Sequence, residues 1–138
     1  MFFNNKKDIK DKDTSFIKIA ALLIHAAKID EKYTSEEKDI IKKSLLELGI
    51  DKSRLEIIIN KAEQSEENSN QILEFTKEIK NLNDLDKTKI IKSLWKIIYS
   101  NKKADIYEAN LMRRLAGLLY IDNKTMGDIK EQIKKEIL

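Results

Sequence analysis

The sequence has no cysteine and no proline, and its 138 residues include one histidine and three glycines. Without cysteine the chain cannot form disulfides, thiolate metal sites or a thiolate nucleophile, so we expect a reducing compartment such as the cytoplasm. His25 alone cannot build the usual zinc site, which draws on several His or Cys ligands. Glycine is too scarce for a phosphate-binding loop, and no serine lies in a nucleophile motif. We therefore predict that the protein is not an enzyme.

Long apolar runs are also absent. The longest near-continuous run, Ile19 to Ile29, is interrupted by His25 and Lys28 and is too short to cross a bilayer, so no transmembrane segment is expected. The first residues, MFFNNKKDIKDKD, do not contain the apolar stretch of a signal peptide. The 27 basic and 24 acidic side chains alternate in sign along the chain. This pattern does not indicate a nucleic-acid partner.

The residues that are plentiful favour helices. Apolar residues make up 41% and charged residues 37% of the chain, and Ile, Leu, Lys and Glu recur at helical spacing. We predict an all-α fold, a single compact domain at 14–138 preceded by a flexible N-terminal segment at 1–13. About seven helices are expected, at 14–29, 34–48, 52–66, 70–82, 84–101, 106–119 and 123–137.

Several helix starts carry capping chemistry. Thr34-x-x-Glu37 and Asp105-x-x-Glu108 match the capping box, in which the first side chain accepts from the third helical amide and the glutamate reaches back. Asp122 stands where the N-cap of the last helix should be. Asp51 is likewise expected to be the N-cap of the helix predicted at 52–66. Gly49, two residues before it, fits a left-handed helix end.

A pattern repeats after 71 residues. Ile40, Ile41, Leu48, Ile50 and Asp51 align with Leu111, Met112, Leu119, Ile121 and Asp122. The sequence therefore predicts an internal duplication, with two pseudo-repeated halves that bury their apolar faces against each other.

Two acidic residues flank the first of the repeated loops. Asp30 ends one predicted helix, and Glu37 is near the start of the next. If the loop folds back, their carboxylates could converge on a hard cation such as Ca²⁺ or Mg²⁺, which prefers oxygen ligands. The alternative is that Glu37 closes a capping box with Thr34 and Asp30 faces solvent. Asn101 and Glu108 repeat the spacing in the second loop, with less negative charge.

The loops and the segment between them resemble the TerB family of tellurite-resistance proteins and TerB-like domains. The stretches that carry the resemblance are AAKIDEKYTSEEKDII, LEFTKEIKNLNDLDKTKIIKSLWKIIYS and YSNKKADIYEANLMRRLAGLL, and it extends over about 16–134. It implies an all-helical domain of about seven helices in two related halves, without enzymatic activity. It also implies a role in tellurite and other chemical stress, with protein partners in membrane-associated stress complexes. A cytoplasmic location, peripheral to the inner membrane, would follow.

The resemblance also implies binding of a divalent metal ion through acidic loop residues. Carried over to this chain, that site falls on Asp30 and Glu37 in the first loop and on Asn101 and Glu108 in the second. The sequence departs from the family pattern, because Lys102 stands where the second loop should have glycine and brings positive charge beside Asn101. We therefore prefer the first loop as the metal site. The alternative function is a helical protein interaction module without a metal site.

Three further side chains attract attention without forming a motif. His25 lies within an apolar tract, and we interpret it as a histidine hydrogen-bonded within the core or at its margin. Trp95 and Tyr99 lie one helical turn apart, and we interpret both as core residues.

Overall fold

The computed structural model describes residues 2–29, 33–68, 72–100 and 106–137. These ranges form seven α-helices and one 3₁₀ helix, and the predicted all-α fold is confirmed. The elements are α1 (Phe2–Lys28), α2 (Ser35–Glu47), η1 (Lys52–Arg54), α3 (Leu55–Glu67), α4 (Leu73–Ile79), α5 (Asp84–Tyr99), α6 (Ile106–Leu118) and α7 (Asn123–Ile137).

The helix boundaries differ most from the predicted ones in three places, and elsewhere they agree within two residues. α1 begins at Phe2, twelve residues before the predicted start of the first helix. The predicted flexibility of the segment 1–13 and the domain boundary at residue 14 stay predictions. The tract at 52–66 begins as η1 and continues as α3. The tract at 70–82 shortens to the two turns of α4.

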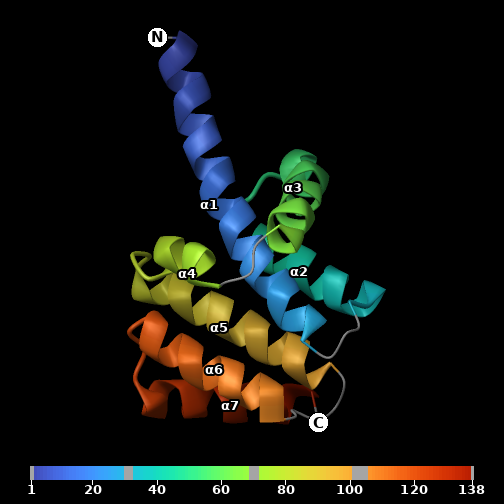
Figure 1. Ribbon diagram of the computed structural model, residues 1–138, viewed down its shortest axis with the longest axis vertical. Coiled ribbons are helices and arrows are strands. Elements are labelled where there is room, and N and C mark those ends of the chain that lie inside the picture. Colours follow the sequence, from blue (N-terminus) through green and yellow to red (C-terminus); the bar gives the residue numbers. More distant parts are fainter. Residues whose placement is uncertain (1, 30–32, 69–71, 101–105, 138) are drawn as a thin grey trace.

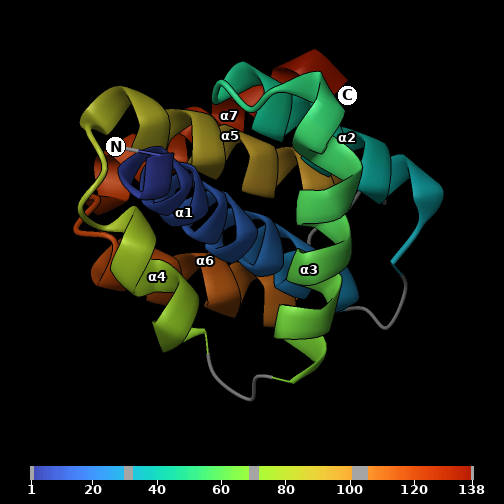
Figure 2. The same cartoon turned by 90° about the horizontal axis from the view of Figure 1, so that it is seen from above.

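α1 and α5 form the centre of the helical packing. α1 contacts α2, α3, α4 and α5, and α5 also contacts α2 and α7. Figure 1 shows α1 descending into the other helices, with its N-terminal part standing above them, and α5, α6 and α7 below, where α7 contacts both α5 and α6. Seen from above, α3 and α4 lie on either side of α1 (Figure 2).

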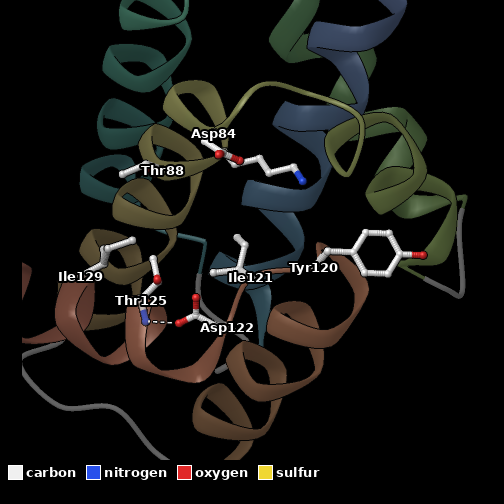
Figure 3. Close-up of a pocket in the computed structure, with 8 residues that line it drawn as sticks. Asp84, Thr88, Tyr120, Ile121, Asp122, Thr125 and Ile129 are labelled. Carbon is white, nitrogen blue, oxygen red and sulfur yellow. Dashed lines mark hydrogen bonds between the residues drawn. The ribbon is translucent and has the colours of Figure 1, made fainter.

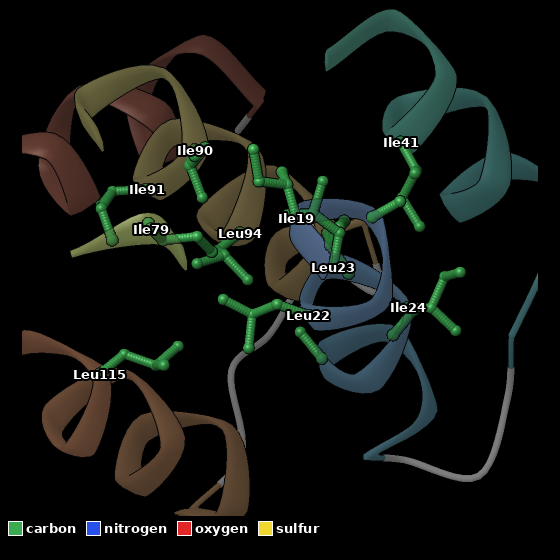
Figure 4. Close-up of a cluster of buried hydrophobic side chains, with 14 of the residues drawn as sticks. Ile19, Leu22, Leu23, Ile24, Ile41, Ile79, Ile90, Ile91, Leu94 and Leu115 are labelled. Carbon is green, nitrogen blue, oxygen red and sulfur yellow. The ribbon is translucent and has the colours of Figure 1, made fainter. Parts of the chain in front are cut away.

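The core follows from the two most apolar segments of the sequence. α1 contributes a continuous buried run from Ile19 to Ile24, and α5 contributes Ile90, Ile91 and Leu94. Figure 4 shows these side chains meeting others from α2, α4 and α6. Trp95 and Tyr99 are 5% exposed and stacked with ring centroids 5.9 Å apart, so their interpretation as core residues is confirmed.

α2 and α6 end in the same way, 71 residues apart. At the end of α2 the Ile50 N–H donates to the Leu45 carbonyl (3.1 Å), and at the end of α6 the Ile121 N–H donates to the Ala116 carbonyl (2.9 Å). This is the long hydrogen bond of a Schellman motif, which requires a left-handed residue just before its donor. The match extends to the next cap, since Asp51 and Asp122 each accept a backbone N–H. The wider division into two related halves stays a prediction.

The left-handed residue differs between the two motifs. Gly49 has φ +103° at the end of α2, as the sequence predicts. At the end of α6 the same position is Tyr120, with φ +58°. A bulky side chain rarely adopts this conformation, because its Cβ crowds the following carbonyl oxygen.

Candidate functional site

The start of α2 holds the one predicted metal-ligating side chain that the structure describes. The Glu37 carboxylate accepts hydrogen bonds from the Thr34 N–H (2.9 Å) and the Thr34 hydroxyl (3.1 Å). In return, the Glu37 N–H donates to the Thr34 hydroxyl oxygen at 3.1 Å. The predicted capping box is thus confirmed, and Glu37 is 2% exposed within it.

Acidic side chains act on Tyr33, which lies beside this cap. Burial raises the pKa of the neighbouring Tyr33 well above its usual range, and the charges of Glu63 and Glu37 raise it further. Within the described ranges the Tyr33 hydroxyl has no partner that meets hydrogen-bond geometry, so Glu63 acts on it mainly through charge. Lys38 offsets part of that charge, since its ammonium lies 3.6 Å from Glu63.

The other predicted ligands are not placed. Asp30 and Asn101 lie outside the described residues, and Glu108 belongs to α6 but its side chain is outside them too. Among the side chains that are described, no three acidic or histidine groups gather where they could hold a metal ion. The metal site at Asp30 and Glu37, and its weaker counterpart at Asn101 and Glu108, therefore stay predictions.

His25 belongs to a partly buried polar cluster that the sequence does not indicate. Its Nδ1 lies 3.3 Å from Glu66 Oε2, and the Lys28 ammonium lies 2.8 Å from the other oxygen of the same carboxylate. Glu66 is 9% exposed, so the interpretation of His25 as a hydrogen-bonded residue at the core margin is confirmed. Glu66 comes from α3, 41 residues away, and no local pattern marks it as the partner.

A cavity of about 270 Å³ lies beside the start of α7 (Figure 3). Its polar groups support helix ends: Lys87 donates to the Leu119 carbonyl (3.1 Å) at the end of α6, and Asp122 accepts from the Thr125 N–H (2.7 Å). Hydrogen bonds from the backbone and side chain of Thr125 to the Asp122 carboxylate lower the pKa of Asp122 below its usual range. The cavity thus marks the junction of α5, α6 and α7.

The Asp122 cap predicts a specific dependence of stability on pH. A carboxyl group whose pKa is lowered by folding stabilises the protein above its unfolded pKa of about 3.9, and this contribution is lost as the pH falls through the folded value. Serine also accepts the capping hydrogen bond but does not titrate. We expect the melting temperature of Asp122→Ser to lie below that of the wild type near neutral pH, with the difference shrinking below about pH 4.

The N-cap of α5 supplies the control, because Asn83 accepts the Asp86 N–H at 2.8 Å and carries no charge. The difference between Asn83→Ser and the wild type should not change with pH. A difference for Asp122→Ser that is equally constant from pH 7 to pH 2 would contradict the prediction.

Tyr120 separates this cavity from a second hollow. We call the latter the Tyr120 groove; its volume is about 210 Å³, and it is lined by Leu73, Lys77, Lys80, Gly117, Leu118 and Tyr120. Tyr120 is 76% exposed, and the Lys80 ammonium lies 5.9 Å from the centre of its ring. The sequence does hold a signal for this residue, because the 71-residue offset places Tyr120 opposite Gly49. We did not predict the groove from that signal.

The comparison with known families agrees with this architecture. The family model described as "Tellurite resistance protein TerB" matches residues 16–131. The chain belongs to the TerB family. The resemblance drawn from the repeated loops is therefore confirmed over most of the chain. Neither the search of curated proteins nor the search of solved structures finds a match.

Membership of the TerB family accounts for the helical fold but does not identify the residues through which this chain acts. In the described part of this TerB-family chain, no helix is both long enough and apolar enough to cross a membrane. Tyr120 combines a positive φ with a highly exposed side chain, whereas Glu37 is buried in a helix cap.

Proposed function

We propose that this TerB-family protein is a non-enzymatic stress-response protein of the tellurite-resistance type that acts by binding a partner protein. The observation that carries this proposal is the role of Glu37. Its carboxylate accepts two hydrogen bonds from Thr34, as a helix cap requires. Glu37 then stabilises the start of α2, and the surface that binds the partner protein lies on exposed faces of the helices.

The family resemblance adds the setting of this proposal. A cytoplasmic location and a partner within a membrane-associated stress complex are consistent with a chain whose described helices do not span a membrane. Exposed large apolar side chains occur on several faces, among them Leu46 on α2, Ile57 on α3, Leu85 on α5, and Tyr120. Single exposed apolar side chains are ordinary on a protein surface, whereas contiguous apolar patches mark interaction sites, so these four positions serve to compare the faces by experiment.

Site-specific photocrosslinking would test partner binding. A benzoylphenylalanine residue would be placed in turn at Leu46, Ile57, Leu85 and Tyr120, and cells of the native host would be irradiated with and without tellurite. We expect a discrete adduct with one protein from one face and none from the others. Folded, expressed variants that form no adduct at any of the four positions would contradict the proposal.

A divalent cation site in the first loop is a second candidate. Its support is the negative charge of Glu37 and Glu63, which raises the pKa of Tyr33 beside the loop. In the sequence Asp30 follows Ile29, near the beginning of the same α1-to-α2 connection, and would supply a further carboxylate. Such a gathering of negative charge attracts Ca²⁺ or Mg²⁺.

Cation-dependent thermal unfolding separates the two candidates. A bound cation at one hundred times its Kd would stabilise the fold by about 2.7 kcal/mol, and EDTA would reverse this. The variants Asp30→Asn and Glu37→Gln should abolish the effect, the latter without removing the cap, because glutamine also fits a capping box. Equal melting temperatures in EDTA and in millimolar Ca²⁺ or Mg²⁺ would exclude the cation site and leave the interaction module.

A further inference from the structure

The backbone at Tyr120 is strained without a structural need for tyrosine. The helix end requires a left-handed residue there, and Gly49 meets the same requirement at the matching position. Tyrosine gains little packing in return, because 76% of it is exposed, and among the described residues its ring has a cation–π contact with Lys80. Strained residues of this kind concentrate at functional sites, where the side chain is held for use.

The ring is directed toward a hollow with an apolar floor. In Figure 3 the Tyr120 side chain extends away from the other labelled residues of the 270 Å³ cavity. On that side lies the Tyr120 groove, between α4 and the end of α6. Leu73 is 42% exposed at its edge and Leu118 is partly buried beneath it. Gly117 leaves the floor open, since a Cβ added there would meet no atom within 4 Å.

The rim of the Tyr120 groove is cationic. Lys77 and Lys80 both line it, and neither forms an ion pair with any residue that the structure describes. The lining contains no acidic side chain among the described residues, in contrast to the neighbouring cavity, where Asp84 and Asp122 take part. Two ammonium groups that have no ion pair among the described residues, beside an aromatic ring and two leucines, complement carboxylates that flank an apolar side chain.

We propose that the Tyr120 groove binds an acidic segment of a partner protein, with one apolar side chain seated between Leu73, Leu118 and the Tyr120 ring. Carboxylates on either side of that apolar residue pair with Lys77 and Lys80. This inference rests on the proposed interaction function and names its surface and the chemistry of its partner. A membrane surface is a poorer match, because two lysines fall short of the clusters of four to eight that anionic lipids require, and the site is concave.

Fluorescence anisotropy with defined peptides tests the proposal. One set of labelled octapeptides carries a central pair of apolar residues, varied among Leu, Ile, Met and Phe, between three glutamates on each side. A matched set carries lysines in place of the glutamates. We expect saturable binding of glutamate-flanked members to the full chain and none of the lysine-flanked set. Failure of every glutamate-flanked member to bind, or equal binding of both sets, overturns the proposal.

Two variants alter the groove without endangering the fold. Tyr120→Gly introduces the residue found at position 49 and should raise the melting temperature by about 3 °C, because it relieves the strained φ. Gly117→Leu fills the floor with the side chain found 71 residues earlier, at Leu46. Each should weaken peptide binding at least about tenfold, as loss of a central contact does. Ile57→Ala, on an exposed part of α3, is the control and should leave binding unchanged.

The remaining outcomes separate this inference from the function on which it rests. Peptide affinity that survives in both groove variants overturns the site. A chain that binds vesicles of anionic phospholipid but no peptide overturns the protein partner. Photocrosslinks on a face away from Tyr120 refute the groove while the interaction function stands, whereas the absence of crosslinks at all tested positions removes both.

Discussion

Replacing Phe75 by alanine is expected to lower the free energy of unfolding by about 3–5 kcal/mol, as large-to-small changes in aromatic core positions do. Phe75 is 1% exposed on α4, a helix of seven residues that has no side-chain N-cap. A helix this short is not stable by itself in water. We therefore expect α4 to remain helical because it packs against α1. Guanidinium unfolding, with midpoint and slope fitted together, would measure the loss.

Leu73 on the same helix provides a matched control. It is 42% exposed, so Leu73→Ala should change stability by less than about 0.5 kcal/mol. A loss below about 1 kcal/mol for Phe75→Ala would show that α4 does not depend on the core in this way. Because α4 carries Leu73 and Lys77, the result also bears on how firmly one wall of the Tyr120 groove is held.

Replacing Glu37 by alanine is expected to cost about 2 kcal/mol of stability. The change removes the acceptor of two hydrogen bonds from Thr34 at a position that is 2% exposed, and it leaves the partly buried Thr34 N–H without that partner. Leaving a buried donor unsatisfied costs about 1–3 kcal/mol, and losing a cap costs about 1 kcal/mol. Chemical unfolding in the presence of EDTA would measure the loss without any contribution from cations.

Glutamine at position 37 distinguishes the cap from the charge. A capping box accepts glutamine at its third helical position, so Glu37→Gln should retain most of the stability that alanine loses. If glutamine costs as much as alanine in EDTA, the negative charge at position 37 matters more than the cap. That result would direct attention back to the acidic surroundings of Tyr33 and Glu63.

Local features were predicted well from the sequence. The Thr34–Glu37 capping box, the left-handed Gly49 and the Asp122 cap each depend on residues within a few positions of one another, and all three are confirmed. The burial of Ile19 to Ile24 also has a local cause, because an unbroken apolar run in a helix has no solvent-facing side.

Contacts between distant segments were not predicted. Glu66 reaches His25 and Lys28 from α3, and the hydroxyl groups of Ser44 and Ser93 meet in the core between α2 and α5. Spacing within one helix says nothing about which other helix its polar residues will face. These pairs depend on how the helices cross, which side-chain packing decides.

The sequence by itself determined the all-helical class, the TerB family and the caps that begin and end several helices, because these depend on periodicity and on short-range hydrogen bonds. The tertiary structure alone decided where a usable surface lies. From the sequence alone, Tyr120 is simply a tyrosine near the end of a predicted helix. Its importance emerges when α4 brings Lys77, Lys80 and Leu73 beside it, since a groove requires two elements whose separation packing sets.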